Sequence, residues 1–317
     1  MEHYDVIIIG TGAAGLSAGV YAGRYNLKTL IIGKEFGGET ARAGVIENWP
    51  GIISIDGYDL MKNMKEHAKH VGAEIMDGTV ERIEKKDNCF DVIVKGKTYH
   101  ATNVVLALGA ERRRLGLPNE KEFTGNGVHF CITCDGPLYT GKTIAVVGGG
   151  DASVKGINLA AQYAEKIYLL VRGDTMRAEP INVERMKQLG DKVEILYQTS
   201  VQEIATKDGK FDKIILSKEY NGGTELDIDG LFIEAGAMPN TAIAAPLALT
   251  TDKAGYLEVN NMMQTNVPGV MAAGDIVNHF GHFKQDITSS AMGAVAATSA
   301  YEYYKEHKSL GGCSHGK

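Results

Sequence analysis

Cysteine is scarce in this sequence, with four in 317 residues. Such a count excludes a disulfide-stapled secreted scaffold and favours a reducing compartment, so we expect a cytoplasmic protein. No apolar run reaches the roughly 18 residues that a membrane span requires. The chain's start lacks a basic segment followed by an apolar one, which predicts no secretory signal. The chain has no excess of basic residues, since it contains 33 Lys and Arg against 39 Asp and Glu. This balance argues against a nucleic-acid partner.

The remaining composition is that of a globular protein, with 44% hydrophobic and 23% charged residues. The length predicts about two domains of ordinary size. Glycine is abundant, with 39 residues, and two glycine-rich turns organise the chain.

The first turn is Gly10-Thr11-Gly12-Ala13-Ala14-Gly15, between a predicted buried strand (4–9) and a predicted helix (16–25). In a dinucleotide-binding unit the three glycines allow a tight turn, close approach to a pyrophosphate and close helix packing. The alternative is a glycine-rich turn without a ligand. An acidic residue near the end of the next strand (29–32) normally binds the ribose, and Glu35 is the candidate.

The second turn is Gly148-Gly149-Gly150-Asp151-Ala152-Ser153, after a strand (143–147) and before a helix (154–163). The strand that follows (166–171) ends without an acidic residue, and Arg172 and Arg177 come next. Arginine at this place favours a 2′-phosphate, hence NADPH, although both arginines could simply face solvent.

Between the turns lies Cys131-Ile132-Thr133-Cys134-Asp135. A zinc site usually needs two cysteine pairs, and the remaining cysteines, Cys89 and Cys313, stand alone. The spacing therefore favours a redox pair, with a metal site or chance pairing as alternatives. We expect Cys89 to be structural and Cys313, in a polar tail, to be an incidental thiol.

The rest of the chain supplies further expected elements. We expect antiparallel strands at 74–83, 90–94 and 97–100, a buried strand at 103–110 and a domain boundary in the charged stretch 111–118. A strand at 269–273 would place Asp275 at a ligand-binding sheet edge. A helix follows at 288–304, and His279 and His282 are interpreted as loop histidines.

These motifs together make the chain resemble the low-molecular-weight thioredoxin reductases of bacteria and archaea, from about residue 4 to 304. The matching motifs are G-T-G-A-A-G (10–15), G-K-E-F-G-G-E (33–39), I-E-N-W-P-G (46–51), C-I-T-C-D-G (131–136), G-G-G-D-A-S (148–153), R-A-E-P (177–180) and A-G-D-I (273–276). The Cys-x-x-Cys-Asp-Gly motif between the nucleotide motifs is the specific one.

The resemblance implies an α/β fold of two Rossmann-like three-layer dinucleotide-binding domains, the second inserted into the first, as in class II pyridine nucleotide-disulfide oxidoreductases. It implies FAD-binding parts at 1–112 and 241–317, an NAD(P)H-binding domain at 113–240, and a homodimer. The implied cofactor-binding residues are Gly10, Gly12, Ala13, Ala14, Gly15, Glu35, Gly38, Glu39, Asn48, Val80, Gly109, Asp275, Gln285 and Ile287 for FAD, and Gly149, Gly150, Asp151, Ala152, Ser153, Arg172 and Arg177 for NADPH.

The implied activity passes electrons from NADPH through FAD and the Cys131–Cys134 disulfide to thioredoxin or a glutaredoxin-like protein. The family pattern places Cys134 towards the flavin, assigns exchange with the substrate to Cys131 and proton transfer to Asp135. No metal is implied. Hinges between the domains would lie near 111–116 and 237–242.

Three positions depart from the family pattern. Asp151 follows the glycines where the family has asparagine, Val171-Arg172-Gly173 replaces His-Arg-Arg, and Glu39 replaces a glutamine. The first two leave room for NADH or reduced ferredoxin as the reductant. A non-catalytic flavin redox sensor is the alternative from another class, although the intact Cys131, Cys134 and Asp135 argue against it.

Overall fold

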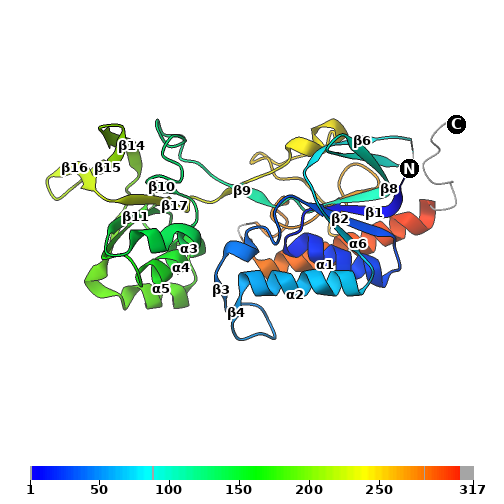
Figure 1. The fold of residues 1–317 in the computed structure, drawn as a ribbon, viewed down its shortest axis with the longest axis horizontal. Coiled ribbons are helices and arrows are strands. Elements are labelled where there is room, and N and C mark those ends of the chain that lie inside the picture. Colours follow the sequence, from blue (N-terminus) through cyan, green and yellow to red (C-terminus); the bar gives the residue numbers. More distant parts are fainter. Residues whose placement is uncertain (1, 88, 282, 308–317) are drawn as a thin grey trace. The chain divides into compact units, whose positions relative to one another are not determined.

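The computed structural model describes residues 2–87, 89–281 and 283–307. The predictions for His282 and Cys313 lie outside these residues. The chain divides into two compact units, one formed by residues 1–111 with 238–317 and the other by residues 112–237. Each is described by itself below (Figure 1).

Unit 1 is built on a seven-stranded sheet with the order β5-β2-β1-β8-β7-β6, and β19 pairs with β8 outside this path. The pairs β2–β5, β1–β2, β1–β8 and β8–β19 are parallel, whereas β7 pairs antiparallel with both β6 and β8. The strands are β1 (His3–Ile9), β2 (Thr29–Gly33), β5 (Glu74–Asp77), β6 (Val80–Lys85), β7 (Phe90–Val94), β8 (Lys97–Leu106) and β19 (Val270–Ala272).

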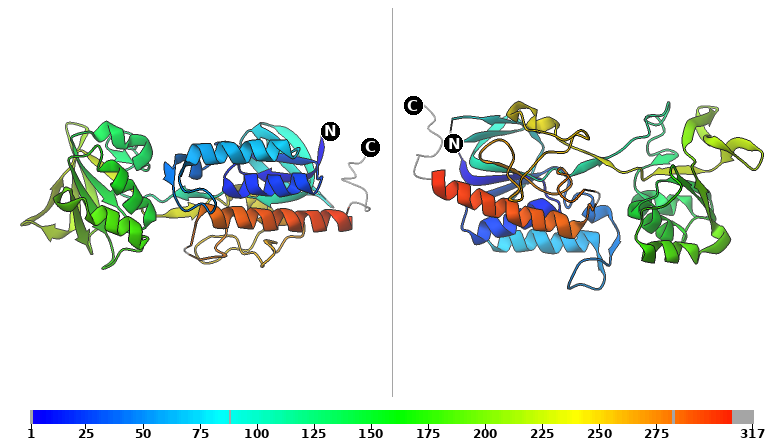
Figure 2. Two further views of the ribbon diagram at one scale, coloured as in Figure 1. Left: turned by 90° about the horizontal axis from the view of Figure 1, so that it is seen from below. Right: turned by 180° about the vertical axis from the view of Figure 1, so that it is seen from behind.

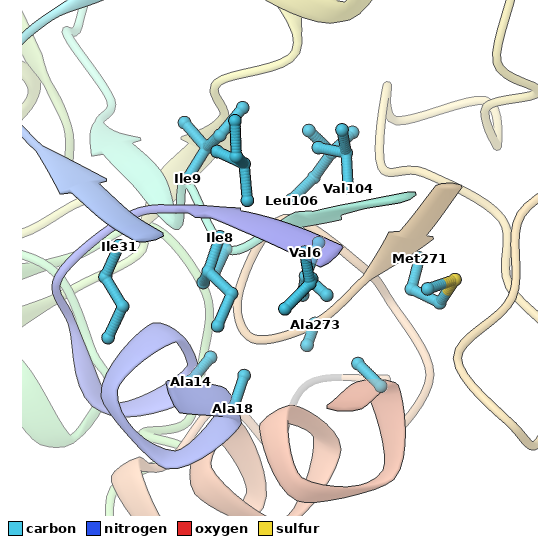
Figure 3. Close-up of a cluster of buried hydrophobic side chains, with 14 of the residues drawn as sticks. Val6, Ile8, Ile9, Ala14, Ala18, Ile31, Val104, Leu106, Met271 and Ala273 are labelled. Atoms are coloured by element: carbon cyan, nitrogen blue, oxygen red, sulfur yellow. The ribbon is translucent and has the colours of Figure 1, made fainter. Parts of the chain in front are cut away.

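The parallel strands are apolar along most of their length because both faces of the sheet are covered. Figure 3 shows Val6, Ile8 and Ile31 pointing towards α1, where small alanine side chains leave room for them. Val104 and Leu106 point to the opposite face of the sheet.

Three long helices lie side by side along unit 1, α1 (Ala13–Arg24), α2 (Gly57–His70) and α6 (Asp286–His307) (Figure 2). The first and the last approach closely because their contact is lined by small residues. A Cβ on Gly293 would lie 2.1 Å from the Ala14 carbonyl oxygen. The Ser17 hydroxyl donates to the Ser290 carbonyl oxygen at 2.7 Å, which ties the two helices together.

Two expected strand boundaries in unit 1 were wrong. Residues 97–100 and 103–110 were expected to be separate strands, but β8 runs unbroken over Lys97–Leu106 because it pairs with β7 at its start and with β1 from His100 onward. Residues 74–83 were expected to form one antiparallel strand. They form β5, which is parallel to β2, and β6, with Gly78 between them, whose N–H donates to the Gly33 carbonyl oxygen.

Unit 2 holds a five-stranded sheet with the order β10-β17-β11-β12-β13, in which every pair is parallel. A separate antiparallel sheet has the order β14-β15-β16. The elements are β10 (Val128–His129), α3 (Ile132–Asp135), β11 (Thr143–Val147), α4 (Asp151–Ala160), β12 (Lys166–Val171), α5 (Pro180–Lys187), β13 (Val193–Tyr197), β14 (Val201–Lys207), β15 (Lys210–Tyr220), β16 (Gly223–Asp227) and β17 (Gly230–Ile233).

The remaining elements are short. β9 (Ala110–Arg112) and β18 (Ala237–Pro239) pair with each other where the chain passes between the units, and β3 (Val45–Ile46) pairs with β4 (Ile55–Asp56). The 3-10 helices are η1 (Thr40–Arg42), η2 (Gly136–Tyr139), η3 (Gly190–Lys192) and η4 (Ala242–Leu247). Among the described helices, none combines the length and the apolar character needed to cross a bilayer.

Candidate functional site

The carboxyl ends of three neighbouring parallel strands in unit 1 meet at one edge of the sheet. The registers place Ile9 opposite Leu106, and Leu106 opposite Ala272. The segments that leave this edge carry Gly10, Gly109 and Asp275, all predicted to bind the cofactor. Ligands of open parallel sheets bind outside this edge, so the topology favours a site there.

The backbone of the first glycine turn requires glycine. Gly10 has φ +125°, and a Cβ there would lie 1.9 Å from the Ala107 carbonyl oxygen, while a Cβ on Gly15 would lie 1.9 Å from the Gly10 oxygen. Gly12 is the N-cap residue of α1, so no side chain of the cap occupies the free N–H groups, and the first turn of that helix has no acidic residue. The N–H groups at the start of α1 are therefore available to a phosphate.

The predicted ribose-binding residue, Glu35, is exposed in the loop after β2. Its carbonyl oxygen accepts from the Thr11 hydroxyl at 2.8 Å, which holds the loop against the glycine turn. Its carboxylate lies 2.6 Å from Arg42, which also approaches Glu39 at 3.6 Å. Because an exposed ion pair is worth only about 0–1 kcal/mol, Arg42 does not prevent Glu35 from binding a hydroxyl.

Asp275 is partly buried beside the glycine edge. Burial raises the pKa of its carboxyl group above the ordinary value, and the charges of Asp286 and Glu39 act in the same direction. The Ser289 hydroxyl, 3.3 Å away, and the Lys284 charge oppose this shift. A carboxylate at this place can accept hydrogen bonds from the hydroxyl groups of a ligand.

Lys284 is a site residue that sequence reasoning missed. Its Nζ donates to the main-chain carbonyl oxygens of Asp275, at 3.4 Å, and Val277, and lies 4.1 Å from the centre of the Tyr256 ring. Burial lowers its pKa, while Asp275 and Asp252 oppose that change. A single lysine in a polar loop carries no sequence signal, because only the fold brings it to Asp275.

Two hydrogen bonds join residues that are far apart in the chain. The Asn48 side-chain amide donates to Gln285 Oε1 at 2.9 Å, so two predicted cofactor-binding residues lie together. The Thr40 hydroxyl donates to Asp286 Oδ1 at 2.5 Å, so η1 is held to the start of α6.

The other predicted flavin residues differ in how much of the side chain is exposed. Gly38 has φ +56°, and a Cβ built on it would be 3.7 Å from the Cα of Gly12. Ile287 is exposed in the first turn of α6. The Val80 side chain is buried in the core at the start of β6, so a ligand could meet only its backbone. His279 lies in the loop after β19 with its ring against Phe280.

These residues fit an FAD molecule. The glycine turn with the uncapped start of α1 suits a pyrophosphate, Glu35 suits an adenosine ribose and Asp275 suits a ribityl chain. Asn48 and Gln285 provide amide groups for a polar ring edge. No group of three or more described His, Cys, Asp or Glu residues is arranged to hold a metal ion.

The second glycine turn is built in a similar way, except that an acidic residue, Asp151, lies in the first turn of its helix. Gly148 has φ +142°, and a Cβ there would lie 2.3 Å from Ser153 Oγ and 2.4 Å from the Glu234 carbonyl oxygen. Gly150 caps α4 without a side-chain hydrogen bond. Ser153 is fully buried under the turn, where there is room only for a small side chain. The start of α4 therefore suits a second pyrophosphate.

The loop after β12 folds back onto this turn. The Arg177 N–H donates to the Gly149 carbonyl oxygen at 2.6 Å. Asp151 Oδ1 accepts from the Glu179 N–H at 2.7 Å. The side chains of Arg172 and Arg177 are exposed, so both can meet a phosphate on the nucleotide.

Cys131 and Cys134 form a disulfide with their Cα atoms 5.3 Å apart. The Cys134 N–H donates to Cys131 Sγ at 3.1 Å, and the Asp135 N–H donates to the Cys131 carbonyl oxygen at 3.0 Å. Cys134 is exposed, and the Asp135 side chain is 35% exposed. The pair is thus open to an external disulfide and lies next in sequence to a carboxyl group.

The disulfide segment packs on the helix of the second glycine turn. A Cβ on Gly156, in α4, would lie 2.5 Å from Ile132 Cδ1. The dithiol–disulfide centre and the second nucleotide turn are therefore built on one packed pair of helices.

A sequence-family model matches residues 4–299 and is described as pyridine nucleotide-disulphide oxidoreductase. A thioredoxin reductase from Bacillus subtilis is 39% identical over 307 residues, which are 96% of this chain and 95% of that protein. The similarity therefore extends over both units.

Two solved structures are similar over the same length. A thioredoxin reductase from Lactococcus lactis has a TM-score of 0.90 and 32% identity, with 96% of this chain and 99% of that chain covered. A ferredoxin-flavin thioredoxin reductase from Clostridium acetobutylicum has a TM-score of 0.52 and 30% identity, with 96% and 99% covered.

Proposed function

This chain belongs to the pyridine nucleotide-disulphide oxidoreductase family, and from that membership we propose that it is a flavin-dependent disulfide reductase that reduces thioredoxin or a glutaredoxin-like protein. The observation that carries the proposal is the Cys131–Cys134 disulfide, which lies beside a carboxyl group and packs on a nucleotide-binding helix. FAD would be held by the turn at Gly10–Gly15 and by Asp275, and when bound it would supply two-electron transfer between a nicotinamide and a disulfide.

In this proposal Cys131, Cys134 and Asp135 each have one task. Cys131 exchanges with the substrate disulfide, Cys134 completes the exchange, and Asp135 moves the proton that the sulfur atoms gain and lose. NADPH is the proposed reductant because Arg172 and Arg177 follow β12 with exposed side chains. A homodimer in the cytoplasm belongs to the same proposal.

Two other reductants compete with NADPH. Val171-Arg172-Gly173 contains a single arginine, which favours less discrimination against NADH. The similarity to a ferredoxin-flavin thioredoxin reductase makes reduced ferredoxin the other candidate. Anaerobic titration of the purified protein with each reductant separates them, because only a true donor bleaches the flavin absorbance near 450 nm.

The test of the function uses the purified full-length protein. Acid release followed by mass measurement should yield FAD, and the protein should reduce oxidised thioredoxin when supplied with NADPH. Release of FMN or of no flavin would contradict the cofactor assignment. A protein whose flavin is reduced but which transfers electrons to neither thioredoxin nor glutaredoxin would instead be a redox sensor.

A further inference from the structure

His129 is a buried histidine two residues before the redox disulfide. It ends β10, and its side chain is 3% exposed. Its ring stacks on Phe232, with 5.1 Å between ring centres, and Nε2 lies 2.7 Å from the Tyr139 hydroxyl oxygen. The ring is thus fixed by two contacts, neither of which involves its other nitrogen.

That other nitrogen faces the carboxyl group of Asp135. Nδ1 lies 3.0 Å from Asp135 Oδ2, but the two groups are not aligned as a hydrogen bond, so the buried Nδ1 has no hydrogen-bond partner among the described residues. A buried polar atom without a partner is costly, so this nitrogen calls for a structural or chemical explanation. Because Asp135 is partly exposed, its side chain can turn to complete this bond.

The neighbours of the ring decide where its proton lies. An ionised carboxylate only accepts hydrogen bonds, so the nitrogen facing Asp135 must carry the hydrogen. Burial raises the pKa of Tyr139 above the ordinary value, and the charges of Asp135 and Asp229 add to this effect. Tyr139 therefore keeps its O–H and donates to Nε2, which fixes the Nδ1–H tautomer.

We propose that His129, with its tautomer fixed by Tyr139, is a positioning residue that holds the Asp135 carboxylate for proton exchange with the cysteine pair. The inference rests on the proposed function, because it assigns a partner to the acid–base group of that reaction. Tyr139 orients the imidazole of His129, and the imidazole orients the Asp135 carboxylate. The carboxylate then exchanges a proton with the sulfur of Cys131.

The proton exchange follows the two halves of the disulfide exchange. In this proposal the reduced pair reacts as the Cys131 thiol and the Cys134 thiolate. As Cys131 sulfur attacks the substrate disulfide, its proton passes to the Asp135 carboxylate, a new S–S bond forms and the substrate S–S bond breaks. The leaving substrate thiolate takes that proton from Asp135. Cys134 thiolate then attacks Cys131 sulfur, which restores the ring disulfide, and the second substrate thiolate takes a proton from water.

Three variants separate positioning from packing. His129→Phe keeps an aromatic ring on Phe232 but removes the N–H. His129→Asn places an amide N–H near the position of Nδ1. Tyr139→Phe removes the hydroxyl that fixes the tautomer of His129. Each is reduced with dithiothreitol, desalted anaerobically and mixed with oxidised thioredoxin, and disulfide formation is followed by acid quench, alkylation and mass measurement. This exchange needs neither nicotinamide nor flavin.

We expect His129→Phe to slow the exchange about tenfold, which corresponds to ~1.4 kcal/mol, and Tyr139→Phe to slow it by less. His129→Asn should recover most of the rate. If His129 acts through Asp135, His129→Phe should cost less than about twofold in an Asp135→Asn background, because coupled residues are not additive.

The same set of measurements can overturn the inference. The positioning role is excluded if the His129→Phe rate lies within twofold of the wild type. It is also excluded if His129→Phe causes an equal loss in the Asp135→Asn background, or if His129→Asn is no faster than His129→Phe. If the reduced wild-type protein fails to exchange with thioredoxin, the proposed function fails instead, so the two failures are distinct.

Discussion

The carboxylate of Asp151 accepts a hydrogen bond from the backbone N–H of Glu179, with 2.7 Å between the two atoms. The bond fastens the start of α4 to the loop that carries Arg177. Asp151, which lies beside the proposed pyrophosphate site, therefore has a structural role in holding that loop. Buried Asn182 lies against the same carboxylate at 3.5 Å. Whether the charge of Asp151 repels a nucleotide or its hydrogen bond anchors the loop can be measured.

Replacing Asp151 separates its charge from its hydrogen bond. Asp151→Ala should raise KM for NADPH about tenfold and for NADH less, because a hydrogen bond to a charged group is worth ~1.5–3 kcal/mol and the loop that it holds carries Arg177. Asp151→Asn keeps an acceptor oxygen and should change either KM by less than about threefold. An Asn variant that binds both nucleotides about tenfold more tightly would show that charge repulsion dominates.

The double variant Arg172→Ala/Arg177→Ala tests the choice of nucleotide. Each charge-assisted bond to a 2′-phosphate is worth ~1.5–3 kcal/mol, so the loss of both should weaken NADPH by at least about 100-fold and leave NADH turnover unchanged. Lys187→Ala, which removes an exposed cation from α5, is the matched control. Equal losses for both nucleotides would mean that the arginines support the loop rather than bind the phosphate.

Single substitutions in the disulfide test the redox centre. Cys131→Ser and Cys134→Ser should each abolish thioredoxin reduction, because neither remaining thiol can close the ring that releases the substrate. Thr133→Ala, between them in α3, should keep activity within about twofold. Thioredoxin reduction with NADPH is the measurement, and wild-type turnover by either serine variant would exclude the pair as the centre.

The packing of α1 against α6 predicts the sign of a stability change. Alanine favours a helix by ~1 kcal/mol over glycine, so Gly293→Ala would stabilise a loosely packed α6. A Cβ there would lie 2.1 Å from the Ala14 carbonyl oxygen, so we expect destabilisation of ~1–3 kcal/mol. Ala291→Gly, at an exposed position of the same helix, should cost about 1 kcal/mol. Urea unfolding of both variants gives the comparison, and a stabilised Gly293→Ala would contradict the close packing.

The raised pKa of Asp275 predicts a pH-dependent stability difference. Burial is the main cause, so the ionised carboxylate costs the folded state stability above the raised pKa, and this cost disappears as pH falls to the ordinary value. Flavin-free Asp275→Asn should therefore melt higher than the flavin-free wild type near pH 7, with the difference shrinking towards pH 4. Thermal melts across this range test it, and a difference that grows on acidification would have the wrong sign. FAD retention should weaken in the same variant.

The sequence by itself determined the local features of this protein. Strands β11 and β12 match their predicted bounds, since continuous apolar runs between glycine and charged residues mark buried parallel strands. The glycine turns and the Cys131–Cys134 spacing are equally local, and the family-level fold inferred from them is confirmed. The roles of the individual site residues stay predictions.

The tertiary structure alone decided which distant residues meet. The unbroken β8, the parallel pairing of β5, the contact of Asn48 with Gln285 and the approach of Lys284 to Asp275 all depend on partners far away in the chain. The short helix α5 was not predicted, because eight residues make only about two turns and carry a weak periodic signal. His129 carried no signal in the sequence, because a histidine acquires a chemical role only from the carboxylate and hydroxyl groups that the fold places beside its two nitrogens.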